Sequence, residues 1–341
     1  MLHCDNAAVR RSLMAKPVIL TAMPVSATLR NRLAERYDVH GPLERSAPEA
    51  IPEAARGARA LITLGGLRTD AALMAALPDL GLVACYGTGF EGVDRSAAAA
   101  RGILVTHAGD ANATSVAEFA MGLVLATARH ILRGDHLVRT GGWTSLTIDR
   151  MPLVPGLAGR RLGIYGLGSI GLKIAQRAAA FEMEVGYHNR SPRTDVPYLY
   201  QESLLQLAAW ADVLVVAVRA SAQNRHAIGP EVLDALGREG VLVNIARGVV
   251  VDEAALCDAL EAGRIAGAGL DVYENEPHVP ERLKALKNTV LTPHMAALSG
   301  AAQAAQQQVL LDNLEAFFAG RPVRWQVPAL PTEGASQPGR A

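Results

Sequence analysis

Residues 162–181 read LGIYGLGSIGLKIAQRAAAF, and this stretch decides the fold. A short apolar run leads into three glycines, and a segment without helix breakers follows. The glycines have the spacing GxGxxG and are Gly166, Gly168 and Gly171. A second apolar run, Glu184 to His188, comes next. Strand, glycine turn, helix and strand in this order predict a dinucleotide-binding unit, because the pyrophosphate can reach the free NH groups at the helix start.

The same spacing occurs a second time, at Gly87, Gly89 and Gly92, also after an apolar run. The helix after this copy spans at best Val93 to Ala100, because Gly102 ends it. Such a helix is too short for a crossover between parallel strands. We therefore interpret the second copy as a tight turn in another domain and assign the cofactor to the first.

Short apolar runs alternate with helical stretches along the whole chain, which predicts an α/β protein with parallel sheets covered on both faces. The ten expected strands are Val18 to Ala22, Ala60 to Leu64, Leu82 to Tyr86, Ile103 to Thr106, Leu162 to Tyr165, Glu184 to His188, Val213 to Val218, Val241 to Ile245, Ala268 to Tyr273 and Thr289 to Leu291. Ten strands exceed one typical sheet, so we expect two Rossmann-like or flavodoxin-like domains.

The division between the domains is predicted from a long apolar stretch, Ala113 to Arg139, interpreted as one continuous helix that joins two sheets. Residues 17–108 plus 295–330 would form a discontinuous substrate domain, and residues 109–294 the dinucleotide-binding domain. The helical pattern from Ala297 to Gly320 would return the chain to the first domain. The ends, 1–16 and 331–341, lack periodicity and are expected to be flexible tails.

Composition favours small-molecule partners. Formal net charge is zero and 50% of the residues are hydrophobic, so no strong field attracts nucleic acid or an anionic membrane. No apolar run has membrane-spanning length and the N-terminus lacks a signal-peptide pattern, which predicts a cytoplasmic protein. Cys4, Cys85 and Cys257 are widely separated, so we expect free thiols and no metal site.

The loop after the second strand of the nucleotide unit predicts the choice of cofactor. An NAD site has an acid there for the ribose hydroxyl. Here the loop reads Tyr187 to Arg193 without a carboxylate, and Asn189, Arg190, Ser191 and Arg193 are the candidate contacts. Two arginines and a hydroxyl suit a 2′-phosphate, so NADPH is the expected cofactor and NAD a possible one. The alternative is a solvated basic loop.

Three strand ends carry groups suited to the reduction of a 2-oxo acid. That reaction needs a cation for the carboxylate, a proton donor for the carbonyl oxygen and a group that keeps the donor protonated. His294 follows the last strand, Arg247 follows Val241 to Ile245, and acids up to Glu276 follow Ala268 to Tyr273. Ligands of open α/β sheets bind beyond the carboxyl ends of strands, so these groups are expected to converge.

Four blocks in this order resemble the D-isomer-specific 2-hydroxyacid dehydrogenase family: 166–171, 244–253, 270–277 and 292–294. The resemblance runs from about residue 58 to 327 and implies an active site in the cleft between two domains. It implies that Arg247 binds the substrate carboxylate and carbonyl oxygen, that His294 is the acid and base, and that Glu276 pairs with His294. The alternative for each is a structural ion pair.

The resemblance also assigns further contacts. Leu64, Gly65 and Gly66 match a substrate loop whose backbone NH groups meet the carboxylate, although an ordinary turn is the alternative. Positions that match the cofactor site are Thr114, Ser169, Ile170, Val218, Ile245, Ala246 and Asp271; Val116 matches a cleft position or belongs to a helix core. Arg219 departs from the family, because many relatives have a proline there, and it either reaches the adenosine phosphate of the cofactor or faces water. Trp143 would contact a partner in a homodimer, either as an interface anchor or within the partner's active site.

Within the family, the runs Ala84 to Gly87 and His188 to Ser191 are most similar to the NADPH-dependent glyoxylate and hydroxypyruvate reductases. The implied reaction is reduction of a small 2-oxo acid to the D-2-hydroxy acid. One alternative is an NAD-dependent dehydrogenase of another 2-hydroxy acid, such as phosphoglycerate or D-lactate. Another is a dinucleotide-sensing corepressor, in which binding is the output.

Overall fold

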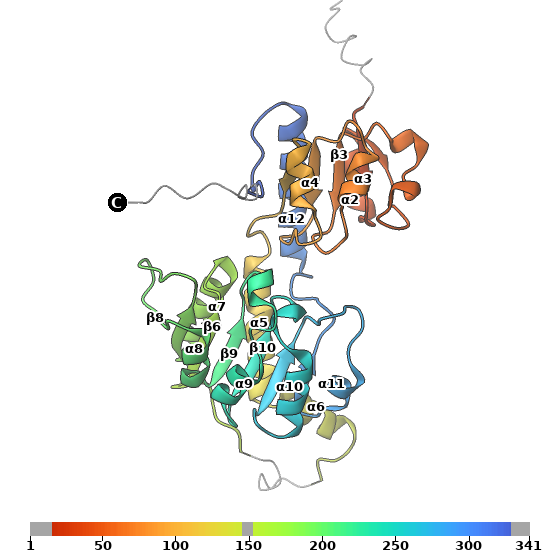
Figure 1. The fold of residues 1–341 in the computed structure, drawn as a ribbon. Helices are drawn as coiled ribbons and strands as arrows, with labels where there is room; N and C mark the ends of the chain where they lie inside the picture. Colours follow the sequence, from red (N-terminus) through yellow and green to blue (C-terminus); the bar gives the residue numbers. More distant parts are fainter. Residues whose placement is uncertain (1–15, 145–152, 329–341) are drawn as a thin grey trace, which may run out of the picture. The chain divides into compact units, whose positions relative to one another are not determined.

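A computed structural model describes residues 16–144 and 153–328. Cys4 and the expected tails, Lys16 excepted, lie outside these ranges. The described chain divides into two compact units, one formed by residues up to Ala111 and from Ala304 on, the other by Asn112 to Gln303. Figure 1 shows that each unit is a sheet covered by helices. The sequence placed the boundaries at 108/109 and 294/295, three and nine residues earlier than the structure does.

The first unit contains a five-stranded parallel sheet with the order β2-β1-β3-β4-β5. Its strands are β1 (Val18–Thr21), β2 (Asp38–His40), β3 (Ala60–Thr63), β4 (Leu82–Cys85) and β5 (Leu104–Thr106). Its helices are α2 (Ala27–Ala34), η1 (Pro48–Ala50), η2 (Glu53–Ala55), α3 (Ala71–Ala75), α4 (Arg95–Ala100) and most of α12 (Gly300–Phe318).

The second unit contains a seven-stranded parallel sheet with the order β12-β11-β10-β9-β6-β7-β8. Its strands are β6 (Arg161–Tyr165), β7 (Glu184–His188), β8 (Leu199–Tyr200), β9 (Val213–Val216), β10 (Val241–Asn244), β11 (Gly267–Leu270) and β12 (Thr289–Leu291). Its helices are α5 (Ala113–Ala128), α6 (Ile131–Arg139), α7 (Ser169–Ala180), α8 (Leu204–Trp210), η4 (Ala222–Asn224), α9 (Pro230–Leu236), η5 (Gly248–Val250), α10 (Glu253–Glu261) and α11 (Glu281–Ala285).

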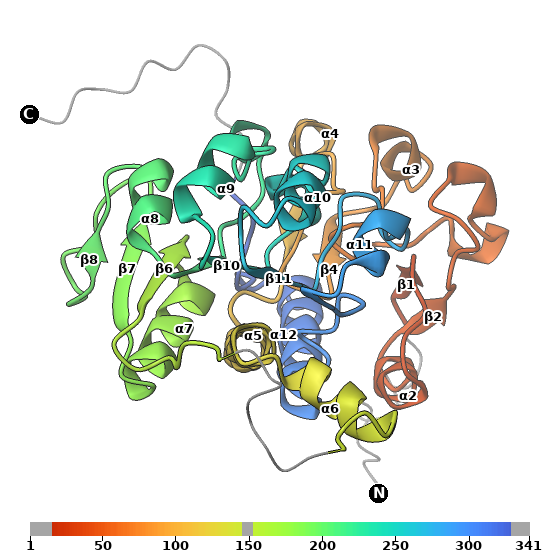
Figure 2. The ribbon, with the colours of Figure 1, turned by 90° about the horizontal axis from the view of Figure 1, so that it is seen from below.

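Both sheets are buried on both faces, as the sequence predicts for α/β proteins. In the second unit, α5 and α7 cover one face, and α8, α9 and α10 cover the other (Figure 2). In the first unit, α3 and α4 lie on one face and α2 and α12 on the other (Figure 2). The α/β fold with two parallel sheets is therefore confirmed.

The continuous helix expected from Ala113 to Arg139 is wrong. The structure has two helices, α5 and α6, bent by 63°. The break lies at His130, whose φ of 52° is left-handed and cannot continue an α-helix. Burial changes at the same point, because α5 is largely buried in the core whereas α6 has no buried residue.

Two short edge strands, β2 and β8, were not expected from the sequence. Both are partly exposed and contain too few residues for an alternating pattern to be recognised. Among the described residues, no single helix is long and apolar enough to cross a membrane; α5 and α6 pass that test only when taken together across their bend.

Candidate active site

The glycine turn after β6 has the geometry that the sequence predicts. Gly166 has a φ of 101°, and a Cβ there would lie 2.6 Å from both the nitrogen and the Cα of Val218. A Cβ on Gly171 would lie 2.2 Å from the carbonyl oxygen of Gly166. A side chain at either position would push the turn away from β9 or from α7, so only glycine fits.

The middle glycine, Gly168, is different because nothing lies within 4 Å of the Cβ it lacks. It is also the N-cap residue of α7 and supplies no side-chain cap, and Ser169 beside it is exposed. The first NH groups of α7 are thus open to a ligand at the positive end of the helix. This open cradle fits the pyrophosphate of a dinucleotide.

The loop after β7 is tied to this cradle. The Leu167 NH donates to Oδ1 of Asn189 at 2.7 Å, and Nη1 of Arg193 donates to the Leu167 carbonyl at 3.0 Å. Arg190 and Ser191 are exposed. The cofactor residues expected in this loop therefore divide into two that support the turn and two that remain accessible.

Arg193 was expected to meet a phosphate, but the structure pairs it with an acid that the sequence analysis did not consider. Its Nε donates to Oδ1 of Asp195 at 2.9 Å, and a second, shorter contact joins Nη2 to Oδ2. The hydrogen bond from Arg193 holds the pKa of Asp195 below its usual value. Much of the positive charge of Arg193 is thus compensated within the loop, which leaves Arg190 as the stronger candidate for a 2′-phosphate.

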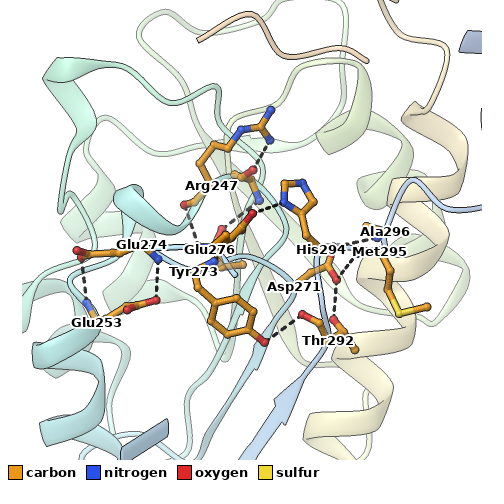
Figure 3. A network of polar contacts seen from close by, with 12 residues as sticks. Arg247, Glu253, Asp271, Tyr273, Glu274, Glu276, Thr292, His294, Met295 and Ala296 are labelled. Atoms are coloured by element: carbon orange, nitrogen blue, oxygen red, sulfur yellow. Dashed lines mark hydrogen bonds and ion pairs between the residues drawn. The ribbon is translucent and has the colours of Figure 1, made fainter. Parts of the chain in front are cut away.

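His294 and Glu276 form the pair expected from the resemblance (Figure 3). Nδ1 of His294 lies 2.7 Å from Oε2 of Glu276, and the Tyr273 NH donates to Oε1 at 3.0 Å. Burial alone would raise the pKa of Glu276, but the hydrogen bonds from His294 and Tyr273, with the charges of His294 and Arg247, outweigh it and lower the pKa. Glu276 is thus an ionised partner beside an accessible imidazole.

The turn that carries His294 is built around the buried carboxylate of Asp271, which is 1% exposed. Oδ1 accepts from the Thr292 hydroxyl at 2.6 Å and the Met295 NH at 2.9 Å, while Oδ2 accepts from the Ala296 NH at 2.9 Å. His294 itself has a left-handed φ of 50°. Asp271, expected beside the nicotinamide, uses both carboxylate oxygens within its own chain, so its visible role is to shape this turn.

Arg247 follows β10 and is fixed by backbone and side-chain contacts. Asn244 accepts from the Ala246 NH at 3.0 Å and donates to the Arg247 carbonyl at 3.1 Å. A Cβ on Gly248 would lie 1.9 Å from the carbonyl carbon of Tyr273, so the turns that carry Arg247 and Glu276 pack backbone against backbone. The end of the sheet formed by β10, β11 and β12 thus carries all three predicted residues. Nη1 of Arg247 donates to the Ala246 carbonyl at 2.6 Å, and the charge of Arg247 contributes to the lowered pKa of Glu276.

The remaining predicted positions have mixed surroundings. Thr114 is exposed on the first turn of α5, whereas Val116 is 4% exposed and belongs to the helix core. Ile245 and Ala246 are buried at the end of β10. Val218 lies against Gly166, as given above, and Arg219 is exposed. Leu64, Gly65 and Gly66 follow β3 and belong to the first unit, whereas the other predicted site residues belong to the second.

A second histidine–carboxylate pair, missed by the sequence analysis, lies on the same turn as Glu276. Nε2 of His226 is 2.6 Å from Oε1 of Glu274, and the Glu274 NH donates to Glu253 at 2.8 Å. Burial raises the pKa of Glu253, with the nearby charge of Glu274 adding to the effect. The pair is separate from His294, although only Asn275 stands between the two acids in the chain.

No metal site accompanies these groups in the part of the chain that the structure describes, since no three His, Cys, Asp or Glu side chains are suitably grouped. An open pyrophosphate site and an accessible histidine–carboxylate pair on one parallel sheet are characteristic of dehydrogenases that use a nicotinamide dinucleotide. The fold and the site therefore define the protein as a member of this class.

Comparison with known proteins makes the class specific. The model of the D-isomer specific 2-hydroxyacid dehydrogenase NAD-binding domain matches residues 121–296. Hydroxyphenylpyruvate reductase from Plectranthus scutellarioides is 38% identical over 309 residues, which cover 89% of this chain and 97% of that protein. Glyoxylate/hydroxypyruvate reductase A from Arabidopsis thaliana is 38% identical over 304 residues, with 89% and 96% covered.

A solved structure gives the same result. NADPH-dependent glyoxylate/hydroxypyruvate reductase from Sinorhizobium meliloti, in complex with NADP and malonate, matches with a TM-score of 0.85 and 40% identity over 92% of this chain and 97% of that chain. The present chain belongs to the D-isomer specific 2-hydroxyacid dehydrogenase family. The resemblance found in the sequence is thereby confirmed, and with it an oxidoreductase that uses NAD or NADP.

Proposed function

We propose that this protein reduces glyoxylate, hydroxypyruvate or a similarly small 2-oxo acid to the D-2-hydroxy acid with NADPH. The observation that carries the proposal is the 2.7 Å pair of His294 and Glu276 in the same unit as the open glycine cradle. Two similar proteins, from Arabidopsis thaliana and Sinorhizobium meliloti, are named glyoxylate/hydroxypyruvate reductases, and the second is named NADPH-dependent.

Each of the three grouped residues has a role in the proposed reaction. The guanidinium of Arg247 binds the substrate carboxylate and polarises the carbonyl. Protonated His294 donates its proton to the carbonyl oxygen, and ionised Glu276 favours that protonated form. The reduced nicotinamide, when bound, supplies the hydride. NH groups of Gly65 and Gly66 would also bind the substrate carboxylate.

The preference for NADPH rests on the loop after β7. Arg190 and Ser191 are accessible there, and Asp195, the nearby acid, is already paired with Arg193. An acid engaged in this way is a poor partner for a ribose hydroxyl, whereas an exposed guanidinium suits a 2′-phosphate. Arg190→Ala is expected to raise the KM for NADPH about tenfold and to leave the KM for NADH within twofold.

Substrate choice within the family is the finer part of the proposal. A site that holds the shared 2-oxo carboxylate through one arginine and backbone NH groups discriminates modestly among side chains. The relative from Plectranthus scutellarioides is named for a much larger acid, hydroxyphenylpyruvate. We therefore expect several short acids to be turned over.

The deciding experiment measures initial rates of NADPH and NADH oxidation with glyoxylate, hydroxypyruvate and pyruvate. His294→Asn is the control, because Asn tolerates the left-handed backbone at this position but cannot act as the acid. Turnover with NADPH that disappears in the control supports the proposal. Faster turnover with NADH favours a dehydrogenase of another 2-hydroxy acid. Dinucleotide binding without turnover of any acid favours a sensor.

A homodimer is also proposed, with α6 and Trp143 as its contact surface. Ile131, Leu132, Val138 and Trp143 are 51%, 52%, 59% and 61% exposed, and α6 buries no residue within its own chain. Apolar side chains this exposed favour a protein partner. A monomer mass at micromolar concentration by light scattering would contradict this.

A cytoplasmic location remains a prediction. Cys85 and Cys257, the described cysteines, are free thiols, which suits a reducing compartment. Fractionation of the cells that produce the protein would test it.

A further inference from the structure

The second glycine motif, Gly87 to Gly92, lies outside the predicted cofactor site, and its surroundings point to another role. It follows β4, and the predicted substrate loop, Leu64 to Gly66, follows β3. These strands are neighbours in the sheet of the first unit. The two loops therefore leave the same edge side by side.

Backbone hydrogen bonds join the two loops directly. The Gly92 NH donates to the Gly65 carbonyl at 2.6 Å, and the Thr69 NH donates to the Gly92 carbonyl at 2.8 Å. The Asp94 NH returns to the Thr69 carbonyl at 2.9 Å. Thr69 is completely buried, and its hydroxyl lies 3.2 Å from that of Thr63 at the end of β3. The substrate loop is thus joined to the glycine motif almost as strands are joined in a sheet.

The contact leaves no room for side chains. A Cβ on Gly65 would lie 2.1 Å from the carbonyl carbon of Gly89. A Cβ on Gly92 would lie 2.4 Å from the Leu67 carbonyl oxygen and 3.0 Å from that of Gly65. All of these neighbours are backbone atoms, which cannot rotate away. Gly66, by contrast, has nothing within 4 Å of its missing Cβ, so the loop is covered on one side and open on the other.

We infer that Gly89 and Gly92 are positioning residues, which hold the substrate loop in place and fix the direction of its NH groups. The inference rests on the proposed function, in which those NH groups bind the substrate carboxylate. Such groups recognise a ligand only when they are held in place, and a displacement of about 1 Å can cost about a hundredfold in rate. Gly89 and Gly92 therefore serve the binding of the acid substrate.

The test compares two alanines in the same motif. Gly92→Ala forces the loops apart, whereas a Cβ on Gly87 would meet only Oε1 of Gln306 at 3.8 Å, an ordinary contact. We expect Gly92→Ala to raise the KM for glyoxylate about ten- to a hundredfold, with a smaller change in kcat, because the carboxylate does not react. The KM for NADPH should stay within twofold, since the cradle belongs to the other unit. Gly87→Ala should match the unchanged protein.

Equal glyoxylate KM values for the two variants would overturn the inference. A second measurement needs no variant: hydrogen exchange of the unchanged protein, followed by mass spectrometry on peptides that cover residues 64–69 and 90–94. The Gly92 and Thr69 amides should exchange as slowly as those of β3. Exchange at the rates of an open loop would also overturn the inference. If no acid is turned over at all, the proposed function fails, while the exchange result still decides whether the glycine motif holds the substrate loop in place.

Discussion

Replacement of Glu276 by Gln should slow reduction while leaving the fold intact. The amide keeps the size of the side chain and can still accept from the Tyr273 NH, which lies 3.0 Å from Oε1. What it loses is the negative charge 2.7 Å from Nδ1 of His294. Without that charge, the hydrogen bond that holds the imidazole in place is weaker, so kcat/KM for reduction should fall.

The size of the loss follows from the geometry of the pair. A hydrogen bond between charged groups contributes about 1.5–3 kcal/mol. The side chains of His294 and Glu276 are 45% and 34% exposed, so solvent screens the pair and the lower end applies. Since about 1.4 kcal/mol corresponds to a tenfold change in rate, we expect kcat/KM to fall about tenfold.

The assay records initial rates of NADPH oxidation with glyoxylate. Glu274→Gln is a matched control, because that carboxylate lies on the same turn but faces His226 at 2.6 Å. Its kcat/KM should equal that of the unchanged protein. An unchanged kcat/KM in Glu276→Gln would refute the role assigned to Glu276, and equal losses in both variants would assign the effect to the charge of the turn as a whole.

Three further predictions concern groups that support the site or the sheet that carries it. Asp271→Asn places amide hydrogens against donors, so we expect about 2–3 kcal/mol less stability in urea unfolding and loss of turnover; an unchanged midpoint would contradict this. Gly166→Ala should lower both the melting temperature and NADPH affinity, whereas Gly168→Ala, which has free space in the protein, should lower affinity alone; fluorescence titration and thermal melts separate the two. Burial opposes ionisation of Asp212, but the NH and guanidinium of Arg161 outweigh it and lower its pKa. The stability this provides is present above the ordinary Asp pKa, about 3.9, and is lost as pH falls. Between pH 6 and 3, Asp212→Asn should therefore lose less thermal stability than the unchanged protein, and parallel curves would speak against the pair.

The fold could be predicted from the sequence wherever a buried element has a recognisable apolar pattern. All ten expected runs overlap a strand, because strands buried on both faces are continuous apolar segments. The helix break at His130 has no sequence signal, since no glycine or proline stands there. Only the packed structure reveals that α5 ends where its buried contacts end.

Similar reasoning explains the site. Arg247, Glu276 and His294 could be predicted as a group because strand ends in a parallel sheet share an edge, and because the family blocks stand in order. Which way a carboxylate points is not encoded in that pattern. Asp271 turns inward to the His294 loop, and Asp195 turns back to Arg193, through side-chain rotations that no spacing predicts.

The order of the strands in the seven-stranded sheet determines how far apart the residues for cofactor choice and for proton transfer lie. The chemical groups follow β10, β11 and β12, whereas the loop with Arg190 follows β7. Five strand steps separate β12 from β7, which is about 24 Å at about 4.8 Å a step, well beyond a Debye length of about 8 Å in physiological salt. A substitution that changes the charge of the Arg190 loop should therefore have little effect on the electrostatic potential at His294. Cofactor choice and proton transfer can evolve, or be engineered, as independent traits on one scaffold.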